Sequence, residues 1–419
     1  MTENGETPAA LAPSDEIAAA IEKRGLRGGI RTLTTLGLQR VRQGEIGPLP
    51  VIVGLLIIAI YFGSQTSWLF FSARNISYLV LQIAATGSVA IGIVLVLLLG
   101  EIDLSVGSIA GLTSATLGIL IVNHNFSWWL AILIMLAVGA AIGAFQGAWF
   151  ALIGVPSFVV TLAGFLAWQG VQLRVLGQNG TVNVFEPHID KIAATFLPNI
   201  WGWVFGIAVA AAYGLSNLYK QIRRRRAGLP AQPLAVLFVY TFVVAAISLG
   251  VVAYLNSYTG VPTAGVILLG LVFFFAWLTT RTKFGRYIFA VGGNAEAARR
   301  AGINVTAIRI WVFTLSGLMA AIGGLMFTSR LTAASTQTGT GTFLLEAIAA
   351  AVIGGTSLFG GRGSVWAALL GVLVIGGVSN GLDLMAKPPE TKYMVEGAVL
   401  LAAVTIDALS RRRRGNVGR

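Results

Sequence analysis

Long uncharged stretches dominate the chain and are separated by short polar or basic segments. Because a hydrocarbon core of about 30 Å needs about 20 apolar residues in a helix, the length of each stretch predicts its number of membrane spans. Residues 46–62 and 75–100 each predict one span, and residues 104–173, which lack Asp, Glu, Lys and Arg, have room for three. Polar breaks at 123–127 and 154–157 divide that long run.

The second half of the chain continues the same alternation. Uncharged runs predict single spans or, in the longest, two spans, at 192–219, 227–280, 310–329 and 363–382. Residues 344–358 are short, and 393–406 carry a glutamate. We predict an all-α, polytopic transmembrane helical bundle of about 10–12 spans, in which segments 100–110 and 344–358 are candidates for broken or re-entrant helices.

Composition and charge agree with a membrane protein. Hydrophobic residues make up 56% of the 419 residues and charged residues 11%, whereas soluble domains carry about 25% charged residues. With a cytoplasmic N-terminus, 23 of the 29 Lys and Arg fall on the inner side, as the positive-inside rule requires. Both termini are then cytoplasmic, with an N-terminal segment at 1–45, a transmembrane domain at 46–409, a cytoplasmic loop at 281–309 and a basic tail at 410–419.

The available residue types argue against several kinds of chemistry. The chain has no cysteine and only two histidines, His124 and His188, so we expect no disulfide and no metal site. No segment is suited to bind and hydrolyse ATP, and we predict no catalytic residue, no cofactor and no enzyme activity. The net charge of +13 lies in blocks between apolar runs, which indicates membrane topology rather than nucleic-acid binding.

Two carboxylates, Glu101 and Asp103, stand between long apolar runs. Charges in such places are costly and are expected to be paired, hydrated or functional. Asp103 and Ser105 are also natural N-caps, since their side-chain oxygens can accept the free N–H groups of the following helix. Structural capping and a direct part in handling a substrate both stay open. Glu346, near a later span, is expected to pair with a basic side chain or to face a polar cavity.

The loop at 281–309 contains the signals of a short helix outside the bilayer. Asn294 is a suitable N-cap, Glu296 lies in the first turn, and Gly302 can adopt the left-handed conformation that ends a helix. These signals predict a helix of about two turns. A short capped helix is common in membrane-surface loops, so local chemistry leaves open whether this helix is a docking element.

Five motifs give this chain a resemblance to a known family. Glu296, Ala297 and Ala298, followed by three residues and Gly302, match the Glu-Ala-Ala-x-x-x-Gly loop of ABC importer permeases. The surrounding sequence, from about 71 to 408, resembles the monosaccharide-importer permeases through Glu101-Ile-Asp-Leu-Ser-Val-Gly-Ser108, Val155-Pro-Ser-Phe-Val-Val-Thr-Leu-Ala-Gly164, Phe284-Gly-Arg-Tyr-Ile288 and Ala347-Ile-Ala-Ala-Ala-Val-Ile-Gly-Gly-Thr-Ser357. The candidate pathway or motif residues are Glu101, Asp103, Ser105, Glu346, Thr356 and Ser357.

The resemblance implies a multi-pass permease of the bacterial inner membrane. In that family the Glu296 to Gly302 loop is the coupling helix that the ATPase subunit grips, so ATP hydrolysis is expected on a separate subunit. Two permease copies pair around one pathway, and a periplasmic or lipid-anchored binding protein delivers the sugar. The expected partners are therefore an ATP-binding subunit, a sugar-binding protein, a second permease copy and membrane lipid, without nucleic acid.

The substrate and the energy source have alternatives. The chain resembles the xylose-type permeases more than the ribose type, which lacks a counterpart to residues 201–255, so the resemblance implies xylose or another pentose. Length and span number also fit a proton-coupled secondary sugar transporter, in which two halves rock around a central site. A self-sufficient transporter would not need the Glu296 to Gly302 loop, which favours the ATP-driven importer.

Overall fold

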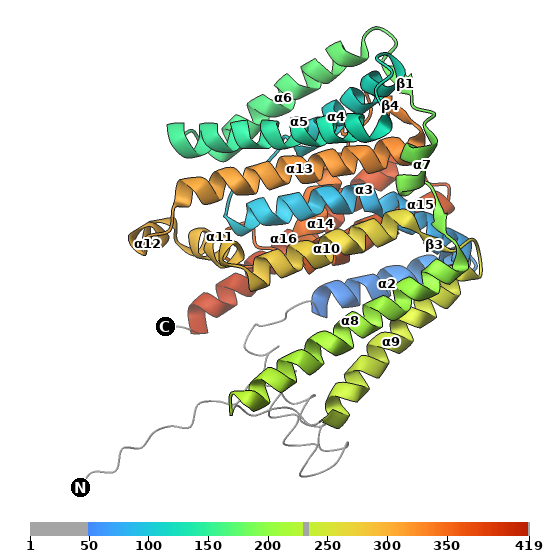
Figure 1. The fold of residues 1–419 in the computed structure, drawn as a ribbon, viewed down its shortest axis with the longest axis vertical. Helices are drawn as coiled ribbons and strands as arrows, with labels where there is room; N and C mark the ends of the chain where they lie inside the picture. Colours follow the sequence, from blue (N-terminus) through green and yellow to red (C-terminus); the bar gives the residue numbers. More distant parts are fainter. Residues whose placement is uncertain (1–48, 229–233, 418–419) are drawn as a thin grey trace. The chain divides into compact units, whose positions relative to one another are not determined.

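The computed structural model describes residues 49–228 and 234–417, with the backbone alone at 49, 235, 403 and 406–417. This part is almost entirely helical (Figure 1). The α-helices are α2 (Leu49–Gln65), α3 (Ala73–Leu98), α4 (Val106–Val122), α5 (Trp128–Ala148), α6 (Ser157–Leu176), α7 (Pro187–Ala193), α8 (Asn199–Arg226), α9 (Leu234–Asn256), α10 (Thr263–Arg281), α11 (Lys283–Gly293), α12 (Ala295–Arg300), α13 (Val305–Leu331), α14 (Phe343–Ile353), α15 (Trp366–Leu384) and α16 (Pro389–Val417). The predicted segment 1–45 lies outside the described residues.

Short elements complete the fold. A 3₁₀ turn, η1 (Leu69–Phe71), precedes α3, and a π-helical turn, η2 (Trp149–Ile153), extends α5. Two antiparallel strand pairs join distant segments: β1 (Thr181–Asn183) pairs with β4 (Ala333–Ser335), and β2 (Phe196–Leu197) pairs with β3 (Val261–Pro262).

Eight described helices are long and apolar enough to cross a membrane: α3, α5 with η2, α6, α8, α9, α10, α13 and α15. The shorter apolar helices are α2, α4 and α14. The predicted polytopic helical bundle is therefore confirmed, and the predicted breaks at 123–127 and 154–157 separate α4, α5 with η2, and α6. The 11 residues of α14 reach only about 16 Å at 1.5 Å per residue, about half of the hydrocarbon thickness.

The described helices fall into two compact units. One contains α8 and α9, within residues 198–260, which pack against each other. The larger unit, residues 47–197 and 261–409, contains the other spans and every predicted site residue. In the larger unit, α11 and α12 lie at one end of the long helices, here called the α12 end, and α7, β1 and β4 lie at the opposite end, the α7 end (Figure 1).

Helix α3 runs through the core of the larger unit and is buried along most of its length. It packs against α10, α13, α14 and α15. Helices α13 and α5 approach closely through small residues: a methyl group on Gly143 would overlap the carbonyl oxygen of Phe313, and one on Gly317 would overlap that of Gly139. Small residues at helix crossings allow such close backbone packing in membrane proteins.

Candidate substrate cavity and coupling segment

Helix α12 is a short, exposed helix with a cap at each end. Asn294 Oδ1 accepts a hydrogen bond from the backbone N–H of Ala297 at 2.9 Å, and Gly302 follows the helix with φ of 81°. The Glu296 carboxylate is exposed and lies 3.7 Å from the guanidinium of Arg300, whereas Ala298 is buried. The predicted capped helix is confirmed. Glu296 is exposed on the surface of the protein, and the buried Ala298 anchors the helix.

The end of α11, directly before α12, touches both interruptions of the helical bundle. The first interruption, residues 99–105, follows α3, and the second, residues 354–365, follows α14. The backbone N–H of Gly361 donates to the carbonyl oxygen of Leu98 at 2.9 Å. A methyl group on Gly292 would overlap that same oxygen and lie 2.8 Å from the nitrogen of Gly361. Glycine at position 292 therefore lets three backbone segments meet without intervening side chains.

Glu101 links the first interruption to two other helices. Its carboxylate accepts a hydrogen bond from the Ser157 hydroxyl at 2.7 Å, at the start of α6. The guanidinium of Arg309 in α13 lies 3.3 Å from the other oxygen of Glu101, and both side chains are mostly buried. The Arg309 guanidinium also lies 4.6 Å from the centre of the Phe150 ring. The pair thus joins the first turns of α13, which follow α12, to the interruption after α3.

Asp103 is the buried centre of a second polar network. One of its carboxylate oxygens accepts from the Ser105 backbone N–H at 2.9 Å and from the Ser105 hydroxyl at 2.6 Å, and the other accepts from the Ser316 hydroxyl at 2.9 Å. Ser105 occupies the N-cap of α4, but its side chain makes no capping bond. Capping by the Ser105 side chain, one of the two alternatives, is therefore not observed, because its hydroxyl lies within hydrogen-bond distance of Asp103 and of Gln146 in α5.

Thr356 and Ser357 lie in the second interruption. Thr356 is buried, and its hydroxyl has no hydrogen-bond partner among the described residues. The Ser357 hydroxyl accepts from the backbone N–H of Phe359 at 3.2 Å, and the Ser357 N–H donates to the carbonyl of Arg362 at 3.0 Å. Ser357 therefore shapes the turn after α14.

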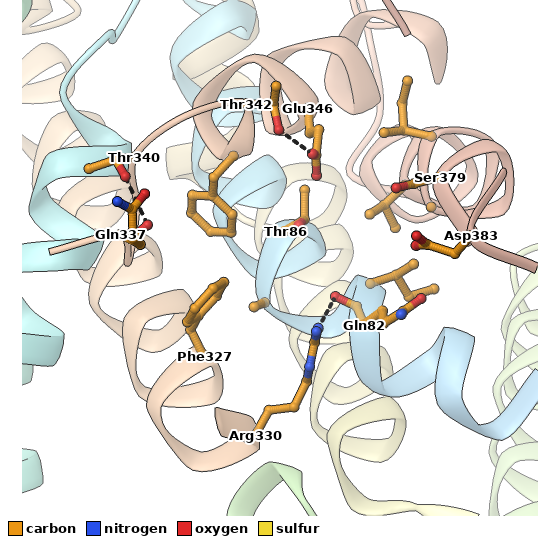
Figure 2. A pocket seen from close by; sticks show the side chains of 16 residues that line it. Gln82, Thr86, Phe327, Arg330, Gln337, Thr340, Thr342, Glu346, Ser379 and Asp383 are labelled. Atoms are coloured by element: carbon orange, nitrogen blue, oxygen red, sulfur yellow. Dashed lines mark hydrogen bonds between the residues drawn. The ribbon is translucent and has the colours of Figure 1, made fainter. Parts of the chain in front are cut away.

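A cavity of about 290 Å³ lies among α3, α13, α14 and α15, together with the loop after β4 (Figure 2). Two phenylalanines, Phe327 and Phe343, form part of its wall. The hydrogen-bonding and charged side chains that line it are Gln82, Thr86, Arg330, Gln337, Thr340, Thr342, Glu346, Ser379 and Asp383. Of the six candidate pathway or motif residues, only Glu346 lines this cavity, and Glu101, Asp103, Ser105, Thr356 and Ser357 belong to the two interruptions.

Three charged side chains line the cavity: Arg330, Glu346 and Asp383. Arg330 points across it toward α3, where its guanidinium lies 3.5 Å from the carbonyl oxygen of Gln82. Glu346 accepts a hydrogen bond from the Thr342 hydroxyl at 2.7 Å. Among the described residues neither charge has an ion-pair partner. Asp383, in contrast, pairs with Lys392 of α16. For Glu346 the sequence left two alternatives, a basic partner or a polar cavity, and the structure shows the cavity position.

Sequence reasoning missed Gln82, Ser379 and Asp383 as cavity residues. All three are polar residues in largely apolar helices, and Ser379 and Asp383 share α15. Polar residues within membrane-spanning helices usually face a cavity or the bundle interior, which is the signal that would have found them. Among the described residues, no three His, Asp or Glu side chains are grouped so that they could hold a metal ion.

The sequence matches a known family of transport proteins. A family model described as the permease component of a branched-chain amino acid transport system matches residues 75–404, which is most of the chain. The chain belongs to this permease family. It is accordingly a multi-pass transport subunit rather than an enzyme, and the family implies an ATP-binding subunit and a substrate-binding protein as partners.

The relatives of the permease are named for sugars. It is 39% identical to the xylose transport system permease protein XylH of Escherichia coli K12 over 387 residues, which are 92% of the permease and 96% of XylH. It is 34% identical to the ribose import permease protein RbsC of the same strain, over 84% of the permease and 91% of RbsC. The fructose import permease protein FrcC of Rhizobium meliloti is 31% identical over 97% of the permease and 99% of FrcC. No solved structure gives a significant match.

Proposed function

We propose that this permease is the membrane-spanning subunit of an ATP-binding-cassette importer that carries a monosaccharide, xylose or another pentose, across the bacterial inner membrane. The observation that carries the proposal is the similarity to XylH over nearly the full length of both chains. The family model is described for branched-chain amino acids, but the relatives, including those named for ribose and fructose, favour a sugar.

The distribution of charge supports an orientation in the membrane. The loop that contains α11 and α12 carries six basic residues: Arg281, Lys283, Arg286, Arg299, Arg300 and Arg309. Because positive residues are retained in the cytoplasm, we place the α12 end in the cytoplasm, with both chain termini on that side. The cavity is lined by Arg330 near the end of α13 and by the loop that follows β4, so it lies toward the outer side, where a binding protein would release its sugar.

In the proposed mechanism, the ATP-binding subunits act on the permease through α12. Two permease copies pair, and a dimer of ATP-binding subunits closes on ATP and pushes the two α12 helices, contacting the exposed Glu296, Ala297 and Gly302 while the buried Ala298 anchors each helix to the permease. Since Gly292 precedes α12 and meets both helix interruptions, movement of α12 is carried directly to α3 and α14. ATP binding and hydrolysis thereby shift the balance between outward-open and inward-open states.

Uptake of labelled xylose tests the proposal in transport-deficient cells. The chain is expressed alone and together with its candidate ATP-binding and binding-protein subunits. Uptake that requires the partners supports the importer. Uptake by the chain alone, abolished by an uncoupler of the proton gradient, would instead establish a proton-coupled secondary transporter and overturn the ATP-driven mechanism.

A single substitution tests the role of α12. We expect Glu296→Ala to lower the uptake rate about tenfold, as loss of a central interface contact does, without reducing the amount of folded permease, because this side chain is exposed. Glu390→Ala is the matched control, since Glu390 is also exposed and lies in the first turn of another helix, α16. Equal uptake by both variants would show that α12 does not receive the ATPase subunit at Glu296.

A further inference from the structure

Helix α8 ends in a strongly basic segment. Its last residues, 220–226, contain Lys220 and four consecutive arginines, Arg223–Arg226. Residues 192–295 contain no Asp or Glu, so neither α8 nor its neighbour α9 supplies a carboxylate that neutralises these charges. Positive charges gathered within about 10 Å of helix length repel one another. A ligand that carries negative charge relieves this repulsion.

Two of the arginines lie on the face of α8 that points away from α9. Gly206 and Gly214 mark the face toward α9, because a methyl group on either would lie 3.0 Å or less from an α9 side chain. At about 3.6 residues per turn, Tyr219, Arg223 and Arg226 fall on the opposite face, where all three are exposed. The Arg223 guanidinium lies 5.9 Å from the centre of the Tyr219 ring. Among the described residues, neither of these two arginines forms an ion pair.

The same face, here called the outward face of α8, is apolar along the rest of the helix. Its exposed apolar residues, spaced three or four apart, are Val204, Ala208, Ala211 and Leu215. The uncharged residues 199–218 span about 30 Å, which is the thickness of the hydrocarbon core. Tyr219 then lies at the edge of that core, and Arg223 lies about 7 Å beyond it, among the lipid headgroups. The outward face therefore changes from apolar to basic at the depth where a phospholipid changes from acyl chain to phosphate.

This arrangement favours a phospholipid over a soluble partner. A soluble protein, such as the ATP-binding subunit, reaches the arginines but not the apolar residues at hydrocarbon depth, whereas a phospholipid contacts both. Arginine also suits a phosphate, because its planar guanidinium donates parallel hydrogen bonds to two phosphate oxygens. The other basic residues are placed differently. The Lys220 ammonium donates to Asn217 Oδ1 at 3.3 Å, and Arg224 is half-buried, so both lie on the side nearer to α9.

We propose that the outward face of α8 binds an anionic phospholipid, with Arg223 and Arg226 on the phosphate and with Tyr219 and Leu215 against an acyl chain. Because positive residues are retained in the cytoplasm, the lipid belongs to the inner leaflet. Each basic residue near an anionic headgroup strengthens the binding about fivefold. The site involves neither the cavity nor α12, so it does not depend on which sugar the permease carries.

Lipid binding to the purified permease tests the inference. The full chain is purified in detergent with its ATP-binding subunits, and native mass spectrometry measures the binding of anionic phosphatidylglycerol and of zwitterionic phosphatidylcholine. Combining Arg223→Gln with Arg226→Gln should weaken phosphatidylglycerol binding about 25-fold, at about fivefold for each arginine. Lys220→Gln with Arg224→Gln is the matched control, because it removes the same charge from the same helix end. Its effect should be much smaller, since these two residues lie farther from the phosphate.

A second pair of substitutions separates lipid binding from membrane insertion. Arg223→Lys with Arg226→Lys keeps both charges and therefore the insertion signal, but lysine lacks the bidentate geometry of arginine. This variant should bind phosphatidylglycerol several-fold more weakly than the unmodified permease. Unchanged binding would refute the contact between the arginines and the phosphate, even if the glutamine variant failed to insert.

The remaining outcomes either support or overturn the site. A preference for phosphatidylglycerol that the paired Arg223 and Arg226 substitutions reduce and the control retains would support it. Equal binding of the two lipids by the unmodified permease, or equal losses in the glutamine variant and its control, would overturn it. If the glutamine variant kept its affinity for phosphatidylglycerol but lost the ATP-binding subunits during purification, the basic end of α8 would be a protein contact and the lipid site would be refuted.

Discussion

Replacement of Gly292 by alanine is the sharpest test of how α12 is connected to the bundle. The added methyl carbon would lie 2.8 Å from the nitrogen of Gly361 and would overlap the carbonyl oxygen of Leu98. Ordinary contact begins at 3.4 Å, so the end of α11 must retreat by at least about 0.6 Å from Gly361 alone. That retreat strains the hydrogen bond between Gly361 and Leu98, which measures 2.9 Å.

The expected size of the effect follows from these contacts. Overpacking of this kind costs about 1–3 kcal/mol, and weakening of the hydrogen bond about 1 kcal/mol more. Alanine regains up to about 1 kcal/mol through its higher helix propensity. Gly292→Ala should therefore destabilise the folded permease by about 1–3 kcal/mol, roughly a 5- to 150-fold change in the folded-to-unfolded ratio.

Gly293→Ala provides the control at the adjacent position. A methyl group there would meet no atom within 4 Å, so this variant should match or slightly exceed the stability of the unmodified protein. Stability is compared by denaturant unfolding in detergent, and function by ATP-driven xylose uptake in proteoliposomes with the partner subunits. Gly292→Ala should lose both stability and uptake. If the two variants behaved alike, the direct contact between α11 and the helix interruptions would be refuted.

Three further outcomes are expected. A double-mutant cycle of Glu101→Gln and Arg309→Met, measured by unfolding in detergent, should give a coupling energy of about 0.5–3 kcal/mol, and additive effects would mean that the 3.3 Å contact carries no energy. Gly302→Val should impair uptake but not binding-protein affinity, because a β-branched residue is strained by about 1–2 kcal/mol at φ of 81°; unchanged uptake would argue against a coupling role. Gly111→Ala should lower the yield of folded protein, since its methyl group would overlap the carbonyl oxygen of Thr338.

Local patterns predicted α12 and the helical, membrane-spanning character of the chain, although eight described helices rather than 10–12 are long and apolar enough to cross a membrane. Run length determines whether a helix can cross a membrane, and Asn294 and Gly302 act on backbone groups within a few residues of themselves. The N-cap of α4 shows the limit of this reasoning. The hydroxyl of Ser105 lies within hydrogen-bond distance of Asp103 and of Gln146, which is 41 residues away, and a local rule does not include a competing partner that only the tertiary fold supplies.

The cavity was beyond local prediction for the same reason. Gln82, Arg330, Glu346 and Asp383 come from four different helices, α3, α13, α14 and α15. Glu346 was noticed because a carboxylate near a span is unusual, and the hydroxyl-rich stretch before α14 contributes Thr340 and Thr342 to the wall. That these side chains meet in one cavity could not be predicted from the sequence, because it depends on how α3 packs against the other helices of the larger unit.

The strand pair β2 and β3 makes the α8 and α9 hairpin separable from the rest of the chain. Phe196 pairs with Pro262 and Leu197 with Val261, so the points where the chain leaves and re-enters the larger unit are neighbouring strands, about 5 Å apart. Only a short turn is needed to bridge such a gap. A short turn from Leu197 to Val261 could therefore replace the α8 and α9 hairpin without moving the two strands, so the backbone path of the larger unit does not depend on the hairpin.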